Sequence, residues 1–225
     1  MALHYSSITK KIIMALAGLF LITFLIVHLS INLLVLLPEP ENEAGRTFNL
    51  AADFMVTNPV IQTMQWVLFG GFILHILLGI ILQIQNWMAR PKRYKVENFA
   101  MTSFFSKFMI HTGAIILLVL VLHLINFFFK AKFGDVGTVI IDGKQYHDMA
   151  GMVIERFSSL PYVILYVVWL LFLGFHLDHA FHSALQSLGL NHNKYTPVAF
   201  GISRALAIII AGGFIIIPLA IYFQQ

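Results

Sequence analysis

The sequence predicts an all-α integral membrane protein, a five-transmembrane-helix bundle that forms a single domain over residues 1–225. Two observations support this fold class. Hydrophobic residues make up 59% of the chain and charged residues only 11%, whereas a soluble domain has roughly 25% charged residues. Five apolar runs also each supply the roughly 20 residues that a helix needs to cross about 30 Å of hydrocarbon.

The five helices are expected at about 12–37, 59–88, 104–129, 159–185 and 202–223. The first run is not expected to be a cleaved signal peptide, because it is too long and carries His28 deep inside. Polar segments join the runs. The longest of these segments ends in GMVIERFSS, a stretch suited to a short interfacial helix.

The distribution of Lys and Arg predicts the orientation. With the N-terminus in the cytoplasm, nine of the 14 basic residues lie inside and five outside, so the positive-inside rule favours this orientation and an outer C-terminus. Basic cytoplasmic edges explain a pI near 9.4 without a nucleic-acid partner. The inner set is Lys10, Lys11, Arg90, Lys92, Arg93, Lys95, Lys107, Lys194 and Arg204, and the outer set is Arg46, Lys130, Lys132, Lys144 and Arg156.

Histidine is the candidate metal ligand. The chain has no cysteine, and therefore no disulfide, no thiolate site and no iron–sulfur cluster of its own. Four apolar runs each carry one deep histidine, and at 1.5 Å per residue these fall at two depths. His28 and His123 lie in the outer half of the membrane, whereas His75 and His176 lie at a central to inner level.

Two depth-matched histidine pairs predict two haem sites. Ionisable groups inside a membrane are costly and by default functional, and two imidazoles on facing helices can hold a haem iron from both sides. Gly71 and Gly79 lie four residues either side of His75, which would leave room for a flat porphyrin. Histidines hydrogen-bonded to a neighbouring helix, and glycines that serve ordinary helix packing, are the alternatives.

The remaining histidines have weaker patterns. In GFHLDHAFHSALQSLG, residues 174–189, His179 and His182 follow His176 at steps of three and turn away toward the interface. With Asp178 they suit a polar pathway, a partner contact or a simple interfacial helix end. His111 suits a polar cap or a contact to a haem propionate. Solvent exposure is expected for His4, His147 and His192.

Four motifs spread over the chain carry a resemblance to a family. They are HLSIN at 28–32, TFNLAADFM at 47–55, FILHILLG at 72–79 and FHLDHAFHSALQSLG at 175–189. With these motifs the chain resembles the di-haem cytochrome b membrane-anchor subunits, of cytochrome b558 type, of bacterial succinate dehydrogenases and fumarate reductases. The resemblance implies that His28 and His123 ligate an outer haem b and that His75 and His176 ligate an inner one. The chain departs from the pattern at His111, where an Arg is expected in relatives.

The resemblance also implies partners and a location. A flavoprotein subunit would interconvert succinate and fumarate, and an iron–sulfur subunit on the cytoplasmic face would exchange electrons with this chain. A membrane quinone, which the di-haem class suggests is menaquinone, would be the other electron-transfer partner. The expected location is the bacterial cytoplasmic (inner) membrane, and a higher oligomer of the complex is compatible with this assignment. Asp53 is the candidate for proton exchange with the quinone, the alternative being a loop carboxylate without a chemical role.

Three other classes compete with this interpretation. The haem b subunits of nitrate reductase and formate dehydrogenase have ligand pairs that share a helix, whereas here four helices provide one histidine each. A membrane di-iron desaturase or hydroxylase would have clustered histidine boxes, and only HLDHAFH resembles one. A transporter that uses buried histidines as a proton relay is the non-redox alternative.

Overall fold

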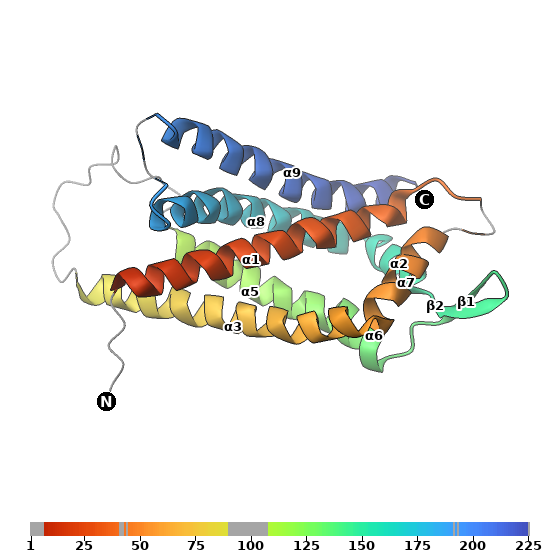
Figure 1. Ribbon diagram of the computed structural model, residues 1–225. Coiled ribbons are helices and arrows are strands. Elements are labelled where there is room, and N and C mark those ends of the chain that lie inside the picture. Colours follow the sequence, from red (N-terminus) through yellow and green to blue (C-terminus); the bar gives the residue numbers. More distant parts are fainter. Residues whose placement is uncertain are drawn as a thin grey trace.

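Five long apolar helices dominate the structure, a computed structural model that describes residues 7–40, 43, 45–89, 108–190, 192 and 194–224. Each is long and apolar enough to cross a membrane, which confirms the predicted five-helix membrane class (Figure 1). The helices are α1 (Ser7–Leu33), extended by a 3-10 turn at Leu34–Leu36; α3 (Pro59–Met88); α5 (Met109–His123), continued by a π-helical turn at Leu124–Phe129 and by α6 (Lys130–Phe133); α8 (Leu160–Ser187); and α9 (Thr196–Phe223).

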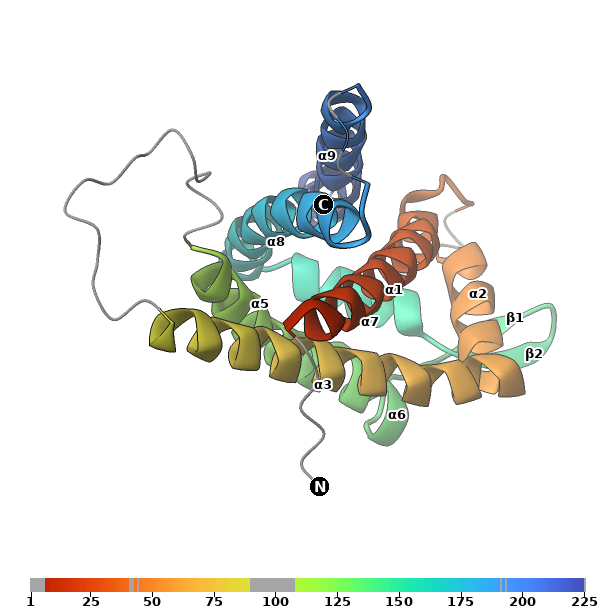
Figure 2. The same cartoon turned by 60° about the vertical axis from the view of Figure 1, so that its left-hand side comes forward.

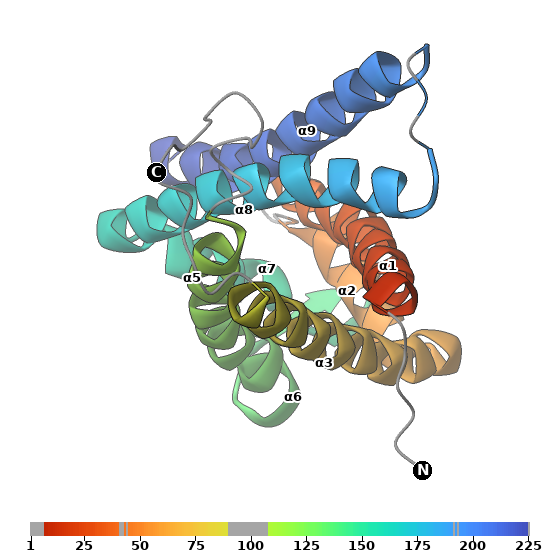
Figure 3. The same cartoon turned by 90° about the vertical axis from the view of Figure 1, so that its left-hand side faces the viewer.

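Four of these helices form a closed ring. α1 packs against α3, α3 against α5, α5 against α8, and α8 back against α1. The fifth helix, α9, lies outside this ring against α8 and α1 (Figures 1 and 3). Because the ring runs in this order, α1 lies diagonally opposite α5 and α3 lies diagonally opposite α8. Side chains on diagonal helices therefore meet in the middle of a four-helix bundle, which is where such bundles hold cofactors.

The packing of the ring is uneven. α8 has buried residues along its length, from Val163 to Ala184, whereas α3 has none. The outward side chains of α3 are strongly exposed, with Val60 and Trp66 each at 70%, as expected for a helix that faces lipid. The side of the ring formed by α3 is thus the least tightly closed.

A cap of short elements lies at the end of the bundle opposite the start of α1 (Figures 1 and 2). It contains α2 (Arg46–Thr57), the antiparallel hairpin β1 (Thr138–Ile141) and β2 (Lys144–His147), and α7 (Met149–Phe157). Asp142 and Gly143 have φ values of 52° and 75°, as a tight two-residue hairpin turn requires. We call this end of the bundle the outer end and the end where α1 begins the inner end.

Side-chain hydrogen bonds join the parts of the cap. Asn49 of α2 is only 1% exposed, and its Oδ1 accepts from the Ala150 N–H at 2.8 Å, while its Nδ2 donates to Asp148 Oδ1 at 3.3 Å. Asp148 in turn caps α7 by accepting from the Gly151 N–H at 2.9 Å. One buried amide therefore connects α2 to the first turn of α7.

Two charged groups support the cap further. Arg46 pairs with Asp142 at 2.6 Å and with Glu43 at 3.1 Å, and the Asp142 carboxylate raises the pKa of the Arg46 guanidinium. Desolvation acts to raise the pKa of Glu39, but hydrogen bonds from the Thr47 hydroxyl and from the N–H groups of Thr47, Arg46 and Gly45 outweigh it and lower that pKa. Glu39 thus links the connection after α1 to the start of α2, and Arg46 links α2 to the turn of the hairpin.

Several predicted boundaries and one predicted connection were wrong. α1 begins earlier than 12, α9 begins at Thr196 rather than 202, and the third span runs on to Phe133; its start was predicted at 104, outside the described residues. The first turn of α1, SITK, is polar and so is not part of the apolar run, and Pro in the first turn of α9 suits a helix start. Neither α2 nor the hairpin was predicted, so Asp53 lies on a helix, not in a loop. The short helix expected in GMVIERFSS is present as α7.

Candidate functional site

The four deep histidines meet as two pairs across the diagonals of the ring. The rings of His28 on α1 and His123 on α5 have centroids 5.9 Å apart. The rings of His75 on α3 and His176 on α8 have centroids 6.4 Å apart. These are the two pairs that depth along the helices predicts. We call them the outer pair and the inner pair.

The ring spacing in both pairs matches two imidazoles that share one metal ion. A metal bound by two imidazole nitrogens, each about 2 Å away, places the ring centroids roughly 6 Å apart. Ordinary edge-to-face contact between two rings gives the same range of centroid distances. The hydrogen bonds of the ring nitrogens are therefore needed to distinguish a metal site from ring packing. A ligating histidine uses one nitrogen for the metal and gives its other N–H to a protein acceptor.

His176 of the inner pair has such an acceptor. The Thr112 hydroxyl of α5 donates to the Met109 carbonyl at 2.9 Å, and its oxygen lies 3.2 Å from His176 Nδ1. Since the only hydroxyl proton is already donated to Met109, the Thr112 oxygen is available to accept from an Nδ1–H. That tautomer leaves His176 Nε2 with a free lone pair. Thr112 is itself buried, at 7% exposure.

The polar neighbours of the outer pair differ from Thr112. Asn32 Nδ2, an amide donor, lies 3.3 Å from His28 Nδ1 and 3.5 Å from its Nε2, and it donates at 2.8 Å to the His28 carbonyl one turn earlier. The Tyr166 hydroxyl of α8 lies 3.5 Å from His123 Nδ1, at the long limit for a hydrogen bond. Directly after His123 the helix widens into its π-helical turn, a feature that often marks functional positions. Within that turn Asn126 donates to the Tyr162 hydroxyl.

His75 differs from the other three histidines. Its Nδ1 is buried and has no hydrogen-bond partner among the described residues. The helix next to it carries Gly18, where an added Cβ would lie 3.7 Å from the His75 ring; Gly113 stands in the same relation to His176, at 3.6 Å. Glycines of α1 and α5 therefore border the inner pair.

The glycines expected to leave room for a porphyrin have another role. An added Cβ at Gly71 would meet the Phe20 ring at 3.0 Å, and one at Gly79 would meet the Met14 methyl at 3.5 Å. Side chains of α1 thus fill the space beside both glycines. The two glycines therefore allow α1 to pack closely against α3. This small-residue helix packing is the alternative stated in the sequence analysis.

The other polar residues of α8 do not join the inner pair. Asp178 lies 3.7 Å from the Arg204 guanidinium of α9, and His182 contacts Phe200 and has its Nε2 3.0 Å from Gln186 Nε2. His179 is half-buried. The residues that the structure describes contain no group of three or more His, Asp or Glu side chains arranged to hold a metal ion.

The histidines expected to be solvated fall partly within the described residues. His147 and His192 are exposed, as predicted, and His4 lies outside the described part of the chain. His111, for which a polar cap or a propionate contact was predicted, is exposed at the start of α5 with its ring beside Phe108.

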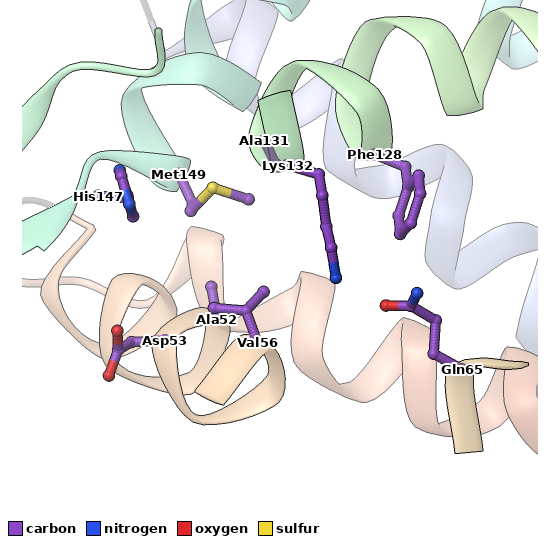
Figure 4. A pocket seen from close by; sticks show the side chains of 9 residues that line it. All are labelled: Ala52, Asp53, Val56, Gln65, Phe128, Ala131, Lys132, His147 and Met149. Atoms are coloured by element: carbon purple, nitrogen blue, oxygen red, sulfur yellow. The ribbon is translucent and has the colours of Figure 1, made fainter. Parts of the chain in front are cut away.

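A pocket of about 220 Å³ lies at the outer end, between α2, α3, α6 and the hairpin. Its floor is apolar, and four polar side chains line it, including that of Asp53. Lys132 reaches from α6 toward Gln65 of α3, and Asp53 lies on the other side of the pocket (Figure 4). The Lys132 ammonium donates to Gln62 Oε1 at 3.0 Å. The lining residues are Ala52, Asp53, Val56, Gln65, Phe128, Ala131, Lys132, His147 and Met149.

Thr112, Tyr166 and Asn32 were not singled out in the sequence. Asn32 had a local signal, because it lies four residues after His28 on the same helical face. Thr112 and Tyr166 reach their histidines across helices, so no spacing within one run identifies them.

A scan against protein-family models and searches among curated proteins and solved structures gave no match.

Proposed function

We propose that this chain is the di-haem cytochrome b membrane subunit of a quinone-linked respiratory complex, of the succinate:quinone oxidoreductase type. The observation that carries the proposal is the pair of diagonal histidine contacts, with ring centroids 5.9 Å and 6.4 Å apart, on four different helices of one membrane bundle. His28 and His123 would hold the outer haem b, and His75 and His176 the inner one.

A hydrogen bond to an imidazole supports ligation over a purely structural role. Nδ1 of His176 lies beside the Thr112 oxygen, which can accept its proton. That arrangement leaves Nε2 of His176 free to bind a metal. His75 Nδ1 is buried and unpaired among the described residues. His75 lies on α3, which has no buried residue. A group bound in the middle of the four-helix ring would therefore add apolar contact to α3, where the bundle lacks it. These residues fit a haem.

The protein supplies position, ligation and an apolar environment. Haem b, when bound, accepts and gives up one electron at its iron. The four helices hold the two sites at different depths of one bundle, and Thr112 sets the tautomer that makes His176 a ligand. The aromatic residues around the outer pair, among them Phe24, Phe127 and Phe214, keep water from the imidazoles.

The family resemblance supports the wider assignment. It implies electron exchange at the inner end with an iron–sulfur subunit that is joined to a succinate-converting flavoprotein, in the bacterial cytoplasmic membrane. The outer pocket suits a quinone ring, since its apolar floor is bordered by groups able to form hydrogen bonds. Asp53 on its rim would exchange the proton that quinone reduction or oxidation requires, with menaquinone as the suggested quinone.

The position of the histidines also bears on the competing classes. Ligand pairs that share a helix, as in the nitrate reductase and formate dehydrogenase type, are not the arrangement of the two pairs described here. A histidine-relay transporter is the second candidate, because the row of His176, His179 and His182 on α8 runs toward the inner end.

Haem content and absorption spectra test the proposal. The purified wild-type chain should contain two haems b per chain and show a b-type signal in reduced-minus-oxidised spectra. His176→Ala should remove one haem and leave the other, because only one axial imidazole is lost. His179→Ala is the matched control on the same helix and should keep both haems.

Two results would count against the proposal. A wild-type chain without a b-type spectrum would favour the transporter, which needs no porphyrin. Haem loss in His179→Ala, with both haems kept in His176→Ala, would show that the wrong member of the row was assigned. Co-purification of flavin and iron–sulfur subunits tests the succinate-specific part separately.

A further inference from the structure

Trp169 lies on the same helix as His176, α8, but closer to the outer end of the bundle. Seven residues separate the two, so they lie on nearly the same face of the helix and about 10 Å apart along it. Trp169 accordingly contacts the outer pair: its ring centroid is 6.1 Å from that of His123, at an interplanar angle of 33°. Tyr166, whose hydroxyl lies near His123 Nδ1, packs edge-on against the indole at 5.4 Å.

The indole N–H of Trp169 has no acceptor among the residues that the structure describes. Trp169 is 9% exposed, and its Nε1 is buried without a hydrogen-bond partner among the described residues. A buried donor left unpaired has lost its hydration without replacement, and few such groups occur in native proteins. An indole can only donate, so the missing partner must be an acceptor.

A second unpaired donor lies on the same side of the bundle. Arg156 of α7 interacts electrostatically with Tyr166, and its Nε is also buried without a partner in the described part of the chain. The wall formed by α7 and α8 next to the outer pair therefore offers two unused donors, one of them positively charged. A negatively charged oxygen is the acceptor that suits this wall best.

We propose that Trp169 Nε1 donates a hydrogen bond to a carboxylate of the group held between His28 and His123. The inference rests on the proposed function, because the strong acceptors on a haem are its two propionate carboxylates. Trp169 is then a positioning residue that turns the carboxylate edge of the outer haem toward α7 and α8. The hydrogen bond also offsets negative charge close to the iron and so favours the reduced state.

The chain contains its own controls for this inference. Of its three tryptophans, Trp66 and Trp87 are on α3 and are 70% and 62% exposed. Trp169→Phe keeps an aromatic ring but removes the donor, and Trp66→Phe makes the same chemical change on the exposed face of α3. In Trp169→Phe both haems should remain bound, while the outer haem becomes about tenfold harder to reduce, a shift of about 59 mV for one electron. Trp66→Phe should shift neither haem.

A second measurement leaves Trp169 in place. In the Trp66→Phe/Trp87→Phe double variant, ultraviolet resonance Raman spectroscopy reports the hydrogen bonding of the single remaining indole. The N–H of Trp169 should be hydrogen-bonded in the haem-loaded chain and free in the chain produced without haem. The same hydrogen-bonded signal in both forms would overturn the inference, since the acceptor would then be protein or water.

Failure of this inference and failure of the proposed function look different. A wild-type chain with two haems, combined with unchanged potentials in Trp169→Phe, would overturn the role of Trp169 and leave the di-haem function intact. A wild-type chain that binds no haem would overturn both.

Discussion

Thr112 is the residue that links the backbone of α5 to the inner histidine pair. Its hydroxyl donates to Met109, and its oxygen is placed to accept from His176 Nδ1. A neutral imidazole with its proton on Nδ1 presents Nε2 as the ligand, and an Nδ1 hydrogen bond also makes that nitrogen more basic. A single hydroxyl therefore controls both the direction and the strength of the proposed ligand.

Thr112→Val tests this control. Valine has nearly the same shape but cannot accept a hydrogen bond, so His176 should keep its position and lose its fixed tautomer. Under the proposed function the affinity of the inner site should fall by about 10–100-fold, the usual effect of losing such a partner. The measurement is haem occupancy of the chain titrated with limiting haem, read from absorption spectra.

The matched control for this test is Thr63→Val. The Thr63 hydroxyl also donates to a backbone carbonyl of its own helix, that of Pro59 at 2.9 Å, but it is exposed and lies near the start of α3. It should leave both sites at wild-type affinity. Equal occupancy in Thr112→Val and Thr63→Val would show that the Thr112 oxygen does not support His176.

The residue scale also shows how far the sequence can predict the site. His28, His75, His123 and His176 could be paired by depth, because helix rise converts residue number into distance along the membrane. The rotation of each helix could not be predicted, since α3, α5 and α8 are apolar on nearly all faces and show no dominant periodicity. Partners that depend on rotation, such as Thr112 and Tyr166, therefore appear only in the structure, as does the contact of Gly71 with Phe20.

At the scale of elements, the cap at the outer end depends on the connection between α2 and α7. Asn49 is buried, and both ends of its side-chain amide are used, toward Ala150 and Asp148. Most of the cap could not be predicted from the sequence, because its elements are short. α2 has 12 residues and each strand has four, too few for an apolar run to stand out beside spans of 25 to 30 residues.

Asn49→Ala should loosen this cap without unfolding the membrane bundle. The change leaves the Ala150 N–H without its acceptor in a buried position, which costs about 1–3 kcal/mol. Hydrogen–deuterium exchange in the α7 segment 149–157 should therefore become faster by roughly 5–160-fold, while exchange in α8 should stay slow. Such local opening is expected because caps and loops have lower local stability than packed spans.

Thr57→Val provides the comparison for the α2 variant. Thr57 ends the same helix, and its hydroxyl donates only to the Asp53 carbonyl at an exposed position. Exchange in α7 should match the wild type in this variant. If Asn49→Ala also matched the wild type, the connection between α2 and α7 would have to reside elsewhere, for example in the contacts of Phe48 and Val153 within the core.

At the scale of the whole molecule, the order of the helices around the ring explains why four histidines from distant parts of the chain form two pairs. Each histidine pair joins two helices that lie diagonally opposite in the ring. Helices that are adjacent in the ring therefore contribute to different histidine pairs. The number of spans and the depth of each histidine follow from the sequence. The closure of the ring, with α9 outside it, depends on contacts between faces that are all apolar and could not be read from the chain alone.

The orientation of the bundle stays a prediction of the positive-inside rule, and it determines which pair would face the proposed iron–sulfur subunit. Alkaline phosphatase becomes active only where disulfides form, outside the bacterial cytoplasm. Fused after Gln225 it should be active, and fused after Leu190, in the connection between α8 and α9, it should be inactive. The reverse result in both fusions would show that the N-terminus is outside. Equal activity in both would mean that α9 does not cross the membrane, because a crossing helix must place its two ends in different compartments.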